Sequence, residues 1–412
     1  MKIFTKNFIL IALIYFISSS ISHAQDPDWT LYNPGNSGLT SNSVIEIVMD
    51  ESGNKWIATY TGGLVKFDGS EWTVYDTSNS GMPGNSVNSI VIDENGTKWI
   101  GTRYNGLAKF DDSDWTVYDI SNSGIPDNGI ESIAIDSNGN KWIGTTNGGL
   151  AKFDGSDWTV YDTSNSGMPT NSINSITTDG DGNIWIGTWN EGLIKFDGSE
   201  WTIYNTINSG LPSNRVYSII LDSYGRKWIT TWTGGIAVFD DSVWTIYNMD
   251  NSGLLSNWVR SIAFDKNGNK WIATYGGGIA KFDGISWAIY NIENSWLPDD
   301  RCRSITIDAN GNKWISTVLG IAVFKGEGTP VEEINNSSVS INFYPNPADN
   351  IIYLDIGSTQ TGKIQIFSVL GEKVLETELS NRIDVSILSE GMYYALIYSG
   401  KNIERKKFII MR

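Results

Sequence analysis

Histidine and cysteine are almost absent from this chain of 412 residues, which contains one of each. His23 lies in an N-terminal segment that we expect to be removed, so the mature chain would hold no imidazole. This excludes Ser-His-Asp and Cys-His nucleophilic sites, histidine-ligated zinc and histidine general bases. Because Cys302 is the only cysteine, the chain forms no internal disulfide and must be stabilised by its hydrophobic core.

Positive charge is also scarce. The chain has 29 lysines and arginines against 46 aspartates and glutamates, a formal net charge of −17. A surface this acidic repels phosphate backbones, so we expect no nucleic-acid partner.

Long apolar runs are missing except for one near the N-terminus, "FILIALIYFI", which follows Lys2 and Lys6 and precedes "SSSISHA". This order is typical of a signal peptide, with cleavage expected before Gln25. As a helix, ten residues would cover about 15 Å, half of a bilayer core of ~30 Å. We therefore expect export rather than a membrane anchor, and no transmembrane segment in the mature chain.

Tryptophan and glycine are abundant instead, with 18 and 43 copies. A tryptophan followed by isoleucine recurs every 43 residues, at Trp56, Trp99, Trp142, Trp185, Trp228, Trp271 and Trp314. A second tryptophan recurs with the same interval, at Trp29, Trp72, Trp115, Trp158, Trp201, Trp244 and Trp287. Each unit holds four short strand-like runs joined by Gly, Asn and Asp turns, the pattern of a propeller blade.

The ends of the repeat region predict how the ring closes. It opens with a lone fourth strand, "WTLY" at 29–32, and ends at Phe324 after a third strand. Together these fragments complete one blade, which avoids two exposed edges. We predict an all-β chain, a seven-bladed β-propeller closed by its N-terminal strand and followed by a small β-sandwich. The expected parts are a signal peptide (1–24), the propeller (25–324), a linker (325–340) and a C-terminal domain (341–412).

The tryptophans then have a structural explanation. We expect Trp56 and its equivalents to fill the space between blades. The residue two positions later is small in every copy, and we expect it to leave room for a neighbouring ring.

The C-terminal residues carry a family resemblance. About seven alternating, strand-like runs follow the linker, and "YPNPADN", "SVLGEKV", "LSEGMYYALI" and "ERKKFIIMR" come in order. The segment resembles the type A C-terminal sorting domain of the type IX secretion system. That resemblance implies export across the outer membrane of a Gram-negative bacterium, removal of the domain, and surface attachment or release. A separate adhesive sandwich is the alternative.

The repeat itself resembles the two-component regulator propeller. The shared pattern is "D-x-x-G-N-x-W-I-G-T … G-G-L-x-x-F-D-G … W-T-x-Y". The resemblance implies a propeller from the periplasmic sensor region of hybrid histidine kinases, which detects carbohydrate fragments. This chain lacks a kinase or DNA-binding segment, so only the propeller and an affinity for glycans are carried over.

One face of the propeller is expected to be monotonous. Each first turn opens with an aspartate, as at Asp179 in "DGDGN". A calcium loop would need a closing glutamate, which is missing here, so these aspartates are interpreted as turn caps. We expect no metal and no cofactor.

The opposite face varies between blades and is the predicted ligand site. Aromatic rings and arginines gather there, mainly in the later blades, and suit sugar rings and carboxylates. The predicted ligand-binding residues are Tyr60, Arg103, Trp189, Trp232, Tyr275, Arg215, Trp258, Arg301 and Trp296. The alternative is local packing of these aromatics over the loops. Arg260 and Arg303 begin innermost strands and either face the channel or pair with a buried carboxylate.

Three functions remain open at this stage. The first is a secreted or surface-attached protein that binds a glycan. The second is a carboxylate-based glycosidase or lyase, for which Glu191 is the candidate, although no second carboxylate stands beside it. The third is a scaffold for protein partners. We rank binding above catalysis, and assign no catalytic residue.

Overall fold

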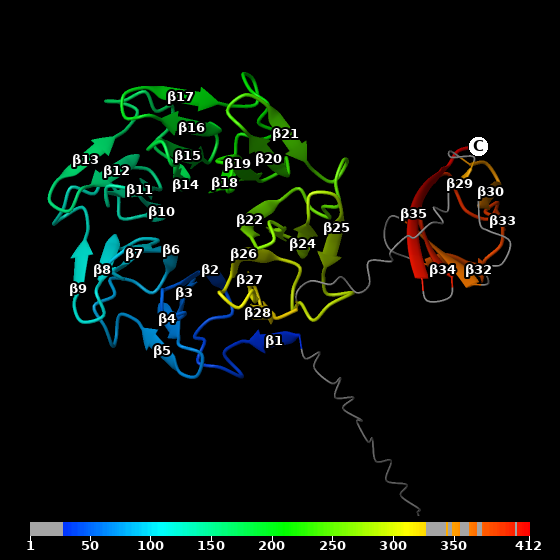
Figure 1. Cartoon of the computed structure of the whole chain (residues 1–412), viewed down its shortest axis with the longest axis horizontal. Helices are drawn as coiled ribbons and strands as arrows, with labels where there is room; N and C mark the ends of the chain where they lie inside the picture. Colours follow the sequence, from blue (N-terminus) through cyan, green and yellow to red (C-terminus); the bar gives the residue numbers. More distant parts are fainter. Residues whose placement is uncertain (1–27, 327–342, 345–347, 355–361, 369–372, 400–401) are drawn as a thin grey trace, which may run out of the picture. The chain divides into compact units, whose positions relative to one another are not determined.

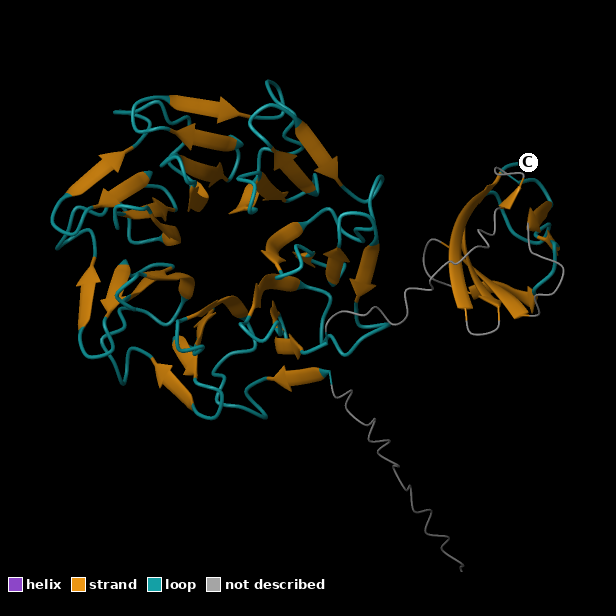
Figure 2. Cartoon of the chain, viewed as in Figure 1, coloured by secondary structure: helices purple, strands orange, loops and turns teal. Residues whose placement is uncertain are grey.

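The structure, a computed structural model, describes residues 28–326, 343–344, 348–354, 362–368, 373–399 and 402–412. The chain divides into two compact units, Met1–Glu327 and Gly328–Arg412. Their described elements are all strands, joined by loops (Figure 2). Nothing in the described ranges forms a helix long and apolar enough to cross a membrane. The predicted signal peptide and residues 327–340 of the predicted linker lie outside the described residues.

The first unit is a propeller of seven four-stranded antiparallel sheets arranged around a central axis (Figure 1). The first blade comprises β2 (Val44–Met49), β3 (Lys55–Thr59), β4 (Leu64–Phe67) and β5 (Trp72–Tyr75). The second comprises β6 (Val87–Ile92), β7 (Lys98–Thr102), β8 (Leu107–Phe110) and β9 (Trp115–Tyr118). The third comprises β10 (Ile130–Ile135), β11 (Lys141–Thr145), β12 (Leu150–Phe153) and β13 (Trp158–Tyr161). The fourth blade comprises β14 (Ile173–Thr178), β15 (Ile184–Thr188), β16 (Leu193–Phe196) and β17 (Trp201–Tyr204). The fifth comprises β18 (Val216–Leu221), β19 (Lys227–Thr231), β20 (Ile236–Phe239) and β21 (Trp244–Tyr247). The sixth comprises β22 (Val259–Phe264), β23 (Lys270–Thr274), β24 (Ile279–Phe282) and β25 (Trp287–Tyr290).

The seventh blade joins the two ends of the repeat region. It orders β1 (Trp29–Tyr32), β28 (Gly320–Phe324), β27 (Lys313–Thr317) and β26 (Cys302–Ile307) in one sheet. β1 pairs with β28 in antiparallel register, from Trp29 opposite Phe324 to Tyr32 opposite Ile321. Both the blade count and the closure predicted from the sequence are confirmed.

A repeated stack fills the space between blades. Trp56 is fully buried and packs with Val87, Ile90 and Ile100 of the next blade. Each indole N–H of this set donates to the aspartate that opens the turn six residues earlier, at 2.8–3.1 Å. In six blades a lysine from the following blade lies over the ring, at 4.7–5.7 Å. The turn aspartates thus both cap their turns and orient the tryptophans.

The expected role of the small residue two positions after each tryptophan needs a correction. A Cβ on Gly101 would come within 2.6 Å of Ile130 Cγ2, and one on Gly144 within 2.5 Å of Ile173 Cγ2. The space therefore admits a β-branched side chain from the next innermost strand, not an aromatic ring. A small residue at this position indicates a close neighbour, but the identity of that neighbour depends on how successive blades pack.

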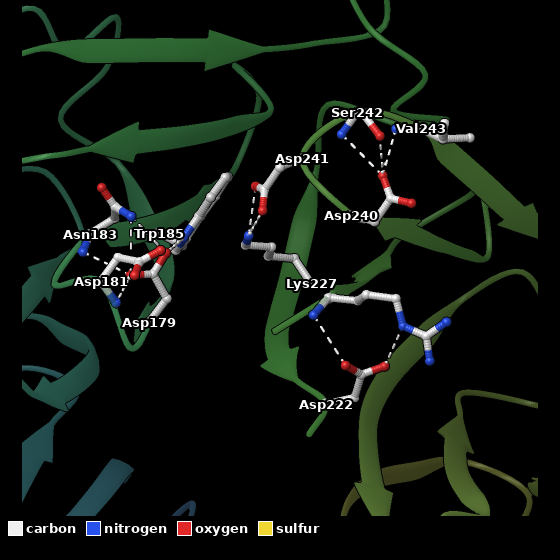
Figure 3. A network of polar contacts seen from close by, with 11 residues as sticks. Asp179, Asp181, Asn183, Trp185, Asp222, Lys227, Asp240, Asp241, Ser242 and Val243 are labelled. Atoms are coloured by element: carbon white, nitrogen blue, oxygen red, sulfur yellow. Dashed lines mark hydrogen bonds and ion pairs between the residues drawn. The ribbon is translucent and has the colours of Figure 1, made fainter. Parts of the chain in front are cut away.

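Two blades add an ion pair to this stack. Lys227, 4% exposed at its side chain, contacts both carboxylate oxygens of Asp241 at 2.6 and 2.7 Å and lies over Trp185 at 4.8 Å (Figure 3). Asp241 has a φ of 73°, at a turn position where blades such as the fourth have Gly198. The ion pair to a buried amine therefore offsets an unfavourable backbone conformation.

Asp241→Asn should lower the free energy of unfolding by about 1 kcal/mol, because asparagine tolerates a positive φ but leaves the Lys227 charge without a counterion. Asp241→Gly relieves the backbone and should lose less. Urea unfolding of both variants measures the difference. Equal stability of Asp241→Asn and wild type would show that solvent satisfies Lys227 without the carboxylate.

The C-terminal unit contains two sheets that share one core. The first sheet orders β29 (Phe343–Tyr344), β30 (Ile351–Leu354) and β33 (Arg382–Asp384), and the second orders β32 (Lys373–Glu378), β31 (Gly362–Ser368), β34 (Gly391–Ser399) and β35 (Asn402–Ile410). Ile352, Ile364, Ala395 and Phe408 belong to the buried cluster between them. The seven described strands coincide with the seven alternating runs in the sequence.

Candidate functional site

Every innermost strand of the propeller carries a bulge at its second residue. In β22, for example, the pairing shifts between Val259 and Ser261, so Arg260 is left out of the ladder. A bulge of this kind redirects the side chain of the extra residue. The seven bulged residues, which we call the channel ring, are Ile45, Asn88, Glu131, Asn174, Tyr217, Arg260 and Arg303.

All seven residues of the channel ring line one cavity of about 380 Å³. That volume lies within the roughly 300–1,000 Å³ of typical small-molecule sites. Every side chain in the ring except the two asparagines and the two arginines differs from the others. The repeat therefore builds a uniform wall but presents a different chemical group from almost every blade.

In three blades the residue after the bulge accepts a hydrogen bond from a backbone N–H of the next blade. Ser132 Oγ accepts the N–H of Ile176 at 3.0 Å. The first blade replaces this serine by Glu46, whose Oε2 accepts the N–H of Ile90 at 2.9 Å. Burial raises the pKa of Glu46 from 4.5 to about 7, and the Ile90 hydrogen bond only partly opposes that effect.

Glu46→Gln should make propeller stability less dependent on pH. The folded-state pKa exceeds the unfolded value, so the contribution of Glu46 is fully present below pH 4.5 and is lost as pH rises through about 7. The variant should match wild type near pH 4 and exceed it by on the order of 2 kcal/mol at pH 8. Thermal unfolding at both pH values measures this.

Ser132→Ala is the matched control for Glu46→Gln. It removes an inter-blade hydrogen bond of the kind that Glu46 makes but changes no titratable group, so its cost should be equal at both pH values. A pH-independent difference between Glu46→Gln and wild type would contradict the assigned pKa.

The single acid of the channel ring is held by polar neighbours. Glu131 Oε1 accepts from the Thr146 hydroxyl at 3.0 Å, and Oε2 accepts from Asn88 Nδ2 at 3.3 Å. Burial raises the pKa of Glu131, while Thr146 and the charge of Arg103 oppose that shift. Asn174 donates to the carbonyl of Val216 in the next blade at 2.5 Å.

The two arginines of the channel ring face the cavity, and the sequence had left their orientation open. Arg260 lies over the Tyr217 ring at 4.4 Å, and Arg303 donates to Ser43 Oγ at 2.5 Å. Neither belongs to any ion pair found among the described residues. The geometry therefore does not support the alternative in which these arginines pair with a buried carboxylate.

The predicted aromatic group of the later blades does come together. The Arg215 guanidinium lies between two indoles, 3.9 Å from the Trp189 ring and 4.4 Å from the Trp232 ring. Trp258 contacts Trp232 at 6.1 Å and Tyr275 at 4.3 Å between ring centroids. Tyr217 joins both sides, at 6.5 Å from Trp189 and 6.2 Å from Trp258. We call these six residues the aromatic–arginine cluster.

Much of this cluster packs against itself, as the local-packing alternative anticipated. Trp232 stays 41% exposed, whereas Trp189 and Trp258 are partly buried. Trp189 also lines the cavity, so the cluster extends from the surface to the channel ring. Among its members, Trp232 has the most surface left for a ligand.

A smaller group lies on the early blades. Arg103, which lines the cavity, lies over Tyr60 at 5.3 Å and over Tyr104 at 5.5 Å. Its Nε donates to the Tyr104 hydroxyl at 2.7 Å. Tyr60 and Tyr104 are 38% and 65% exposed. Tyr104 was missed because it stands one position beyond the variable site compared between repeats.

Two predicted residues lie outside the cavity wall. Arg301 stands beside Tyr275 of the cluster, with which it forms an isolated β-bridge, but its guanidinium forms a two-point ion pair with Asp299 at 2.8 and 2.7 Å. Trp296 packs against the hydrophobic cluster that contains Trp29 and Phe324, where the ring closes. Glu191, the catalytic candidate, is exposed and does not line the cavity either. Within the described ranges no group of three or more acidic, histidine or cysteine residues could hold a metal ion.

The comparisons with known families match both parts of the chain. Residues 342–411 match the secretion system C-terminal sorting domain, and residues 167–190, 210–233 and 253–276 match the two component regulator propeller. The chain therefore resembles two component regulator propellers in its repeats and the secretion system C-terminal sorting domain in its last part. Both resemblances are confirmed, and the sorting domain supports a secreted or cell-surface location. A search of curated proteins gave no match.

Several solved structures share the fold. The extracellular domain of BT3049 from B. thetaiotaomicron, described as a hybrid two component system, has a TM-score of 0.68 and 20% identity over 93% of this chain and 57% of its own. PorZ, a surface component of the type-IX secretion system of Porphyromonas gingivalis, has a TM-score of 0.60 and 20% identity over 91% of this chain and 60% of its own. Virginiamycin B lyase from Staphylococcus aureus has a TM-score of 0.59 and 15% identity over 72% of this chain and 98% of its own.

This chain spans only between half and two thirds of the length of the first two structures. At these identities the likeness establishes the fold alone.

Proposed function

We propose that this protein is an exported binding module whose propeller holds a saccharide at the channel mouth. The observation that carries the proposal is the aromatic–arginine cluster beside the 380 Å³ cavity, with Trp232 exposed and Trp189 in the cavity wall. Aromatic faces with adjacent hydrogen-bond donors suit the apolar faces and hydroxyls of sugar rings. A protein scaffold would use the same face but would show no affinity for sugars.

The route of export is part of the proposal. The sorting domain at 342–411 favours the type IX secretion system of a Gram-negative bacterium. A signal peptide at residues 1–24 would deliver the chain to the periplasm first, and the mature protein would then be attached to the surface or released.

Deleting residues 342–411 should keep the propeller from reaching the cell surface or medium, since the deletion removes the sorting domain and leaves the compact unit 1–327 intact. Cell fractionation of a host with this secretion system, with detection of the propeller, measures the outcome. Undiminished surface or medium levels of the truncated chain would contradict this route.

Trp232→Ala should weaken saccharide binding at least tenfold, or about 1.4 kcal/mol, because the exposed indole face is lost. A glycan array identifies a ligand, and titration calorimetry then measures its affinity. Tyr224→Ala is the matched control, since Tyr224 is 83% exposed in the turn at the other end of β19. Equal affinities of all three proteins would remove Trp232 from the site.

Carboxylate-based catalysis is the second candidate. Glu46 and Glu131 both line the cavity, and both have raised pKa values. A raised pKa in a cavity is the property expected of a carboxylic acid that acts as a general acid. Lyase chemistry of the virginiamycin B type is less favoured. A histidine-to-alanine variant of that enzyme is described as catalytically inactive. The only histidine of this chain, His23, precedes the propeller. Hydrolysis of a polysaccharide panel, abolished by Glu131→Gln, would place catalysis above binding.

A further inference from the structure

The cavity holds more positive charge than its acids can pair. Arg103, Arg260 and Arg303 line the cavity, the last two on the bulges of neighbouring blades. No ion pair among the described residues includes any of the three. Glu131 is held by Thr146 and Asn88, and Glu46 by the Ile90 N–H.

These guanidinium groups disfavour one another. Burial lowers the pKa of Arg260, and the charge of Arg215 lowers it further. Burial also lowers the pKa of Arg303, and the charge of Arg260 adds to this effect. Because arginine keeps its proton in proteins, both side chains remain charged and the repulsion persists. An anion bound in the cavity would offset the repulsion between these arginines.

Hydrogen-bond donors are also in excess beside the cavity. The Nε of Arg215 and the Nε1 of Trp258 are buried and have no partner. A buried donor without an acceptor costs about 1–3 kcal/mol, so a ligand oxygen at this place would recover free energy. Both residues belong to the cluster that Tyr217 links to Arg260.

We infer that the channel binds a saccharide bearing a carboxylate, a uronic acid unit, with the carboxylate received by Arg260 and Arg303 and the sugar lying toward the aromatic–arginine cluster. This inference rests on the proposed function and specifies its substrate class. The guanidinium fork matches the two oxygens of a carboxylate. A neutral sugar would leave both charges uncompensated.

The overall charge of the protein limits the size of such a ligand. A net charge of −17 repels an extended polyanion at long range, whereas contacts inside a cavity act at short range. The cavity volume of about 380 Å³ likewise suits a short acidic oligosaccharide or a chain end.

Calorimetry with the full chain and three matched trisaccharides tests the inference: one with a glucuronate unit, its carboxyl-reduced glucose counterpart, and a 6-sulfated counterpart. We expect the glucuronate form to bind at least tenfold more tightly than the reduced form. Arg260→Gln and Arg303→Gln should each lower the ratio of the two affinities to near one. Arg303→Lys keeps the charge and should retain part of the preference.

Arg226→Gln is the control, because Arg226 is paired with Asp222 in the turn at the other end of β19, away from the cavity wall. Melting curves check that each variant folds, and removing a buried like charge favours folding. Equal affinity for the glucuronate and reduced forms would overturn this inference and leave saccharide binding standing. Preference for the sulfated form would overturn the carboxylate assignment. Binding of none of the three would count against both.

Discussion

The pairing of β1 with β28 is the constraint on which the site depends. It joins Trp29 to Phe324, makes the seventh blade a complete four-stranded sheet and turns a row of repeats into a closed ring. Closure also brings Lys55 of the first blade over Trp314 of the seventh, at 5.1 Å, so the stack between blades continues across the joint. Only in a closed ring do seven innermost strands face one another, and Arg303 reaches Ser43 from the opposite end of the propeller sequence.

Within that ring the scaffold and the site use different residues. Tryptophans, turn aspartates and lysines repeat and carry the packing between blades. The channel ring and the aromatic–arginine cluster vary between blades, and they include charged groups of the cavity wall and two buried donors without a partner. This separation results from the bulge. In a regular strand, side chains alternate between the two faces of the blade and pack against its neighbours, whereas the bulged residue does not follow this alternation and can face the channel.

The sequence predicted the fold almost completely because the 43-residue period fixes the blade, and the two terminal fragments fix the closure. It predicted the aromatic–arginine cluster for the same reason, since aligned repeats expose positions such as Trp189 and Trp258. It missed Tyr217 and Glu131, because nothing in "VYSIIL" or "IESIAI" marks a bulge that turns the second residue inward. Trp296 was predicted to lie on the ligand face because it replaces the glycine of the other repeats. In the structure it packs against the hydrophobic cluster that β1 helps to form in the seventh blade, which the repeat pattern does not reveal.

The bulges also determine how easily a propeller of this kind can acquire a new specificity. Asn88 and Asn174 use their amides to hold the carbonyl of the following blade, so exchanging them disturbs the frame. Ile45, Tyr217 and Arg260 make no such tie among the hydrogen bonds of the described chain, and each comes from a different blade. Single-codon changes at those positions would alter the chemistry of the cavity wall without altering the blades that support it.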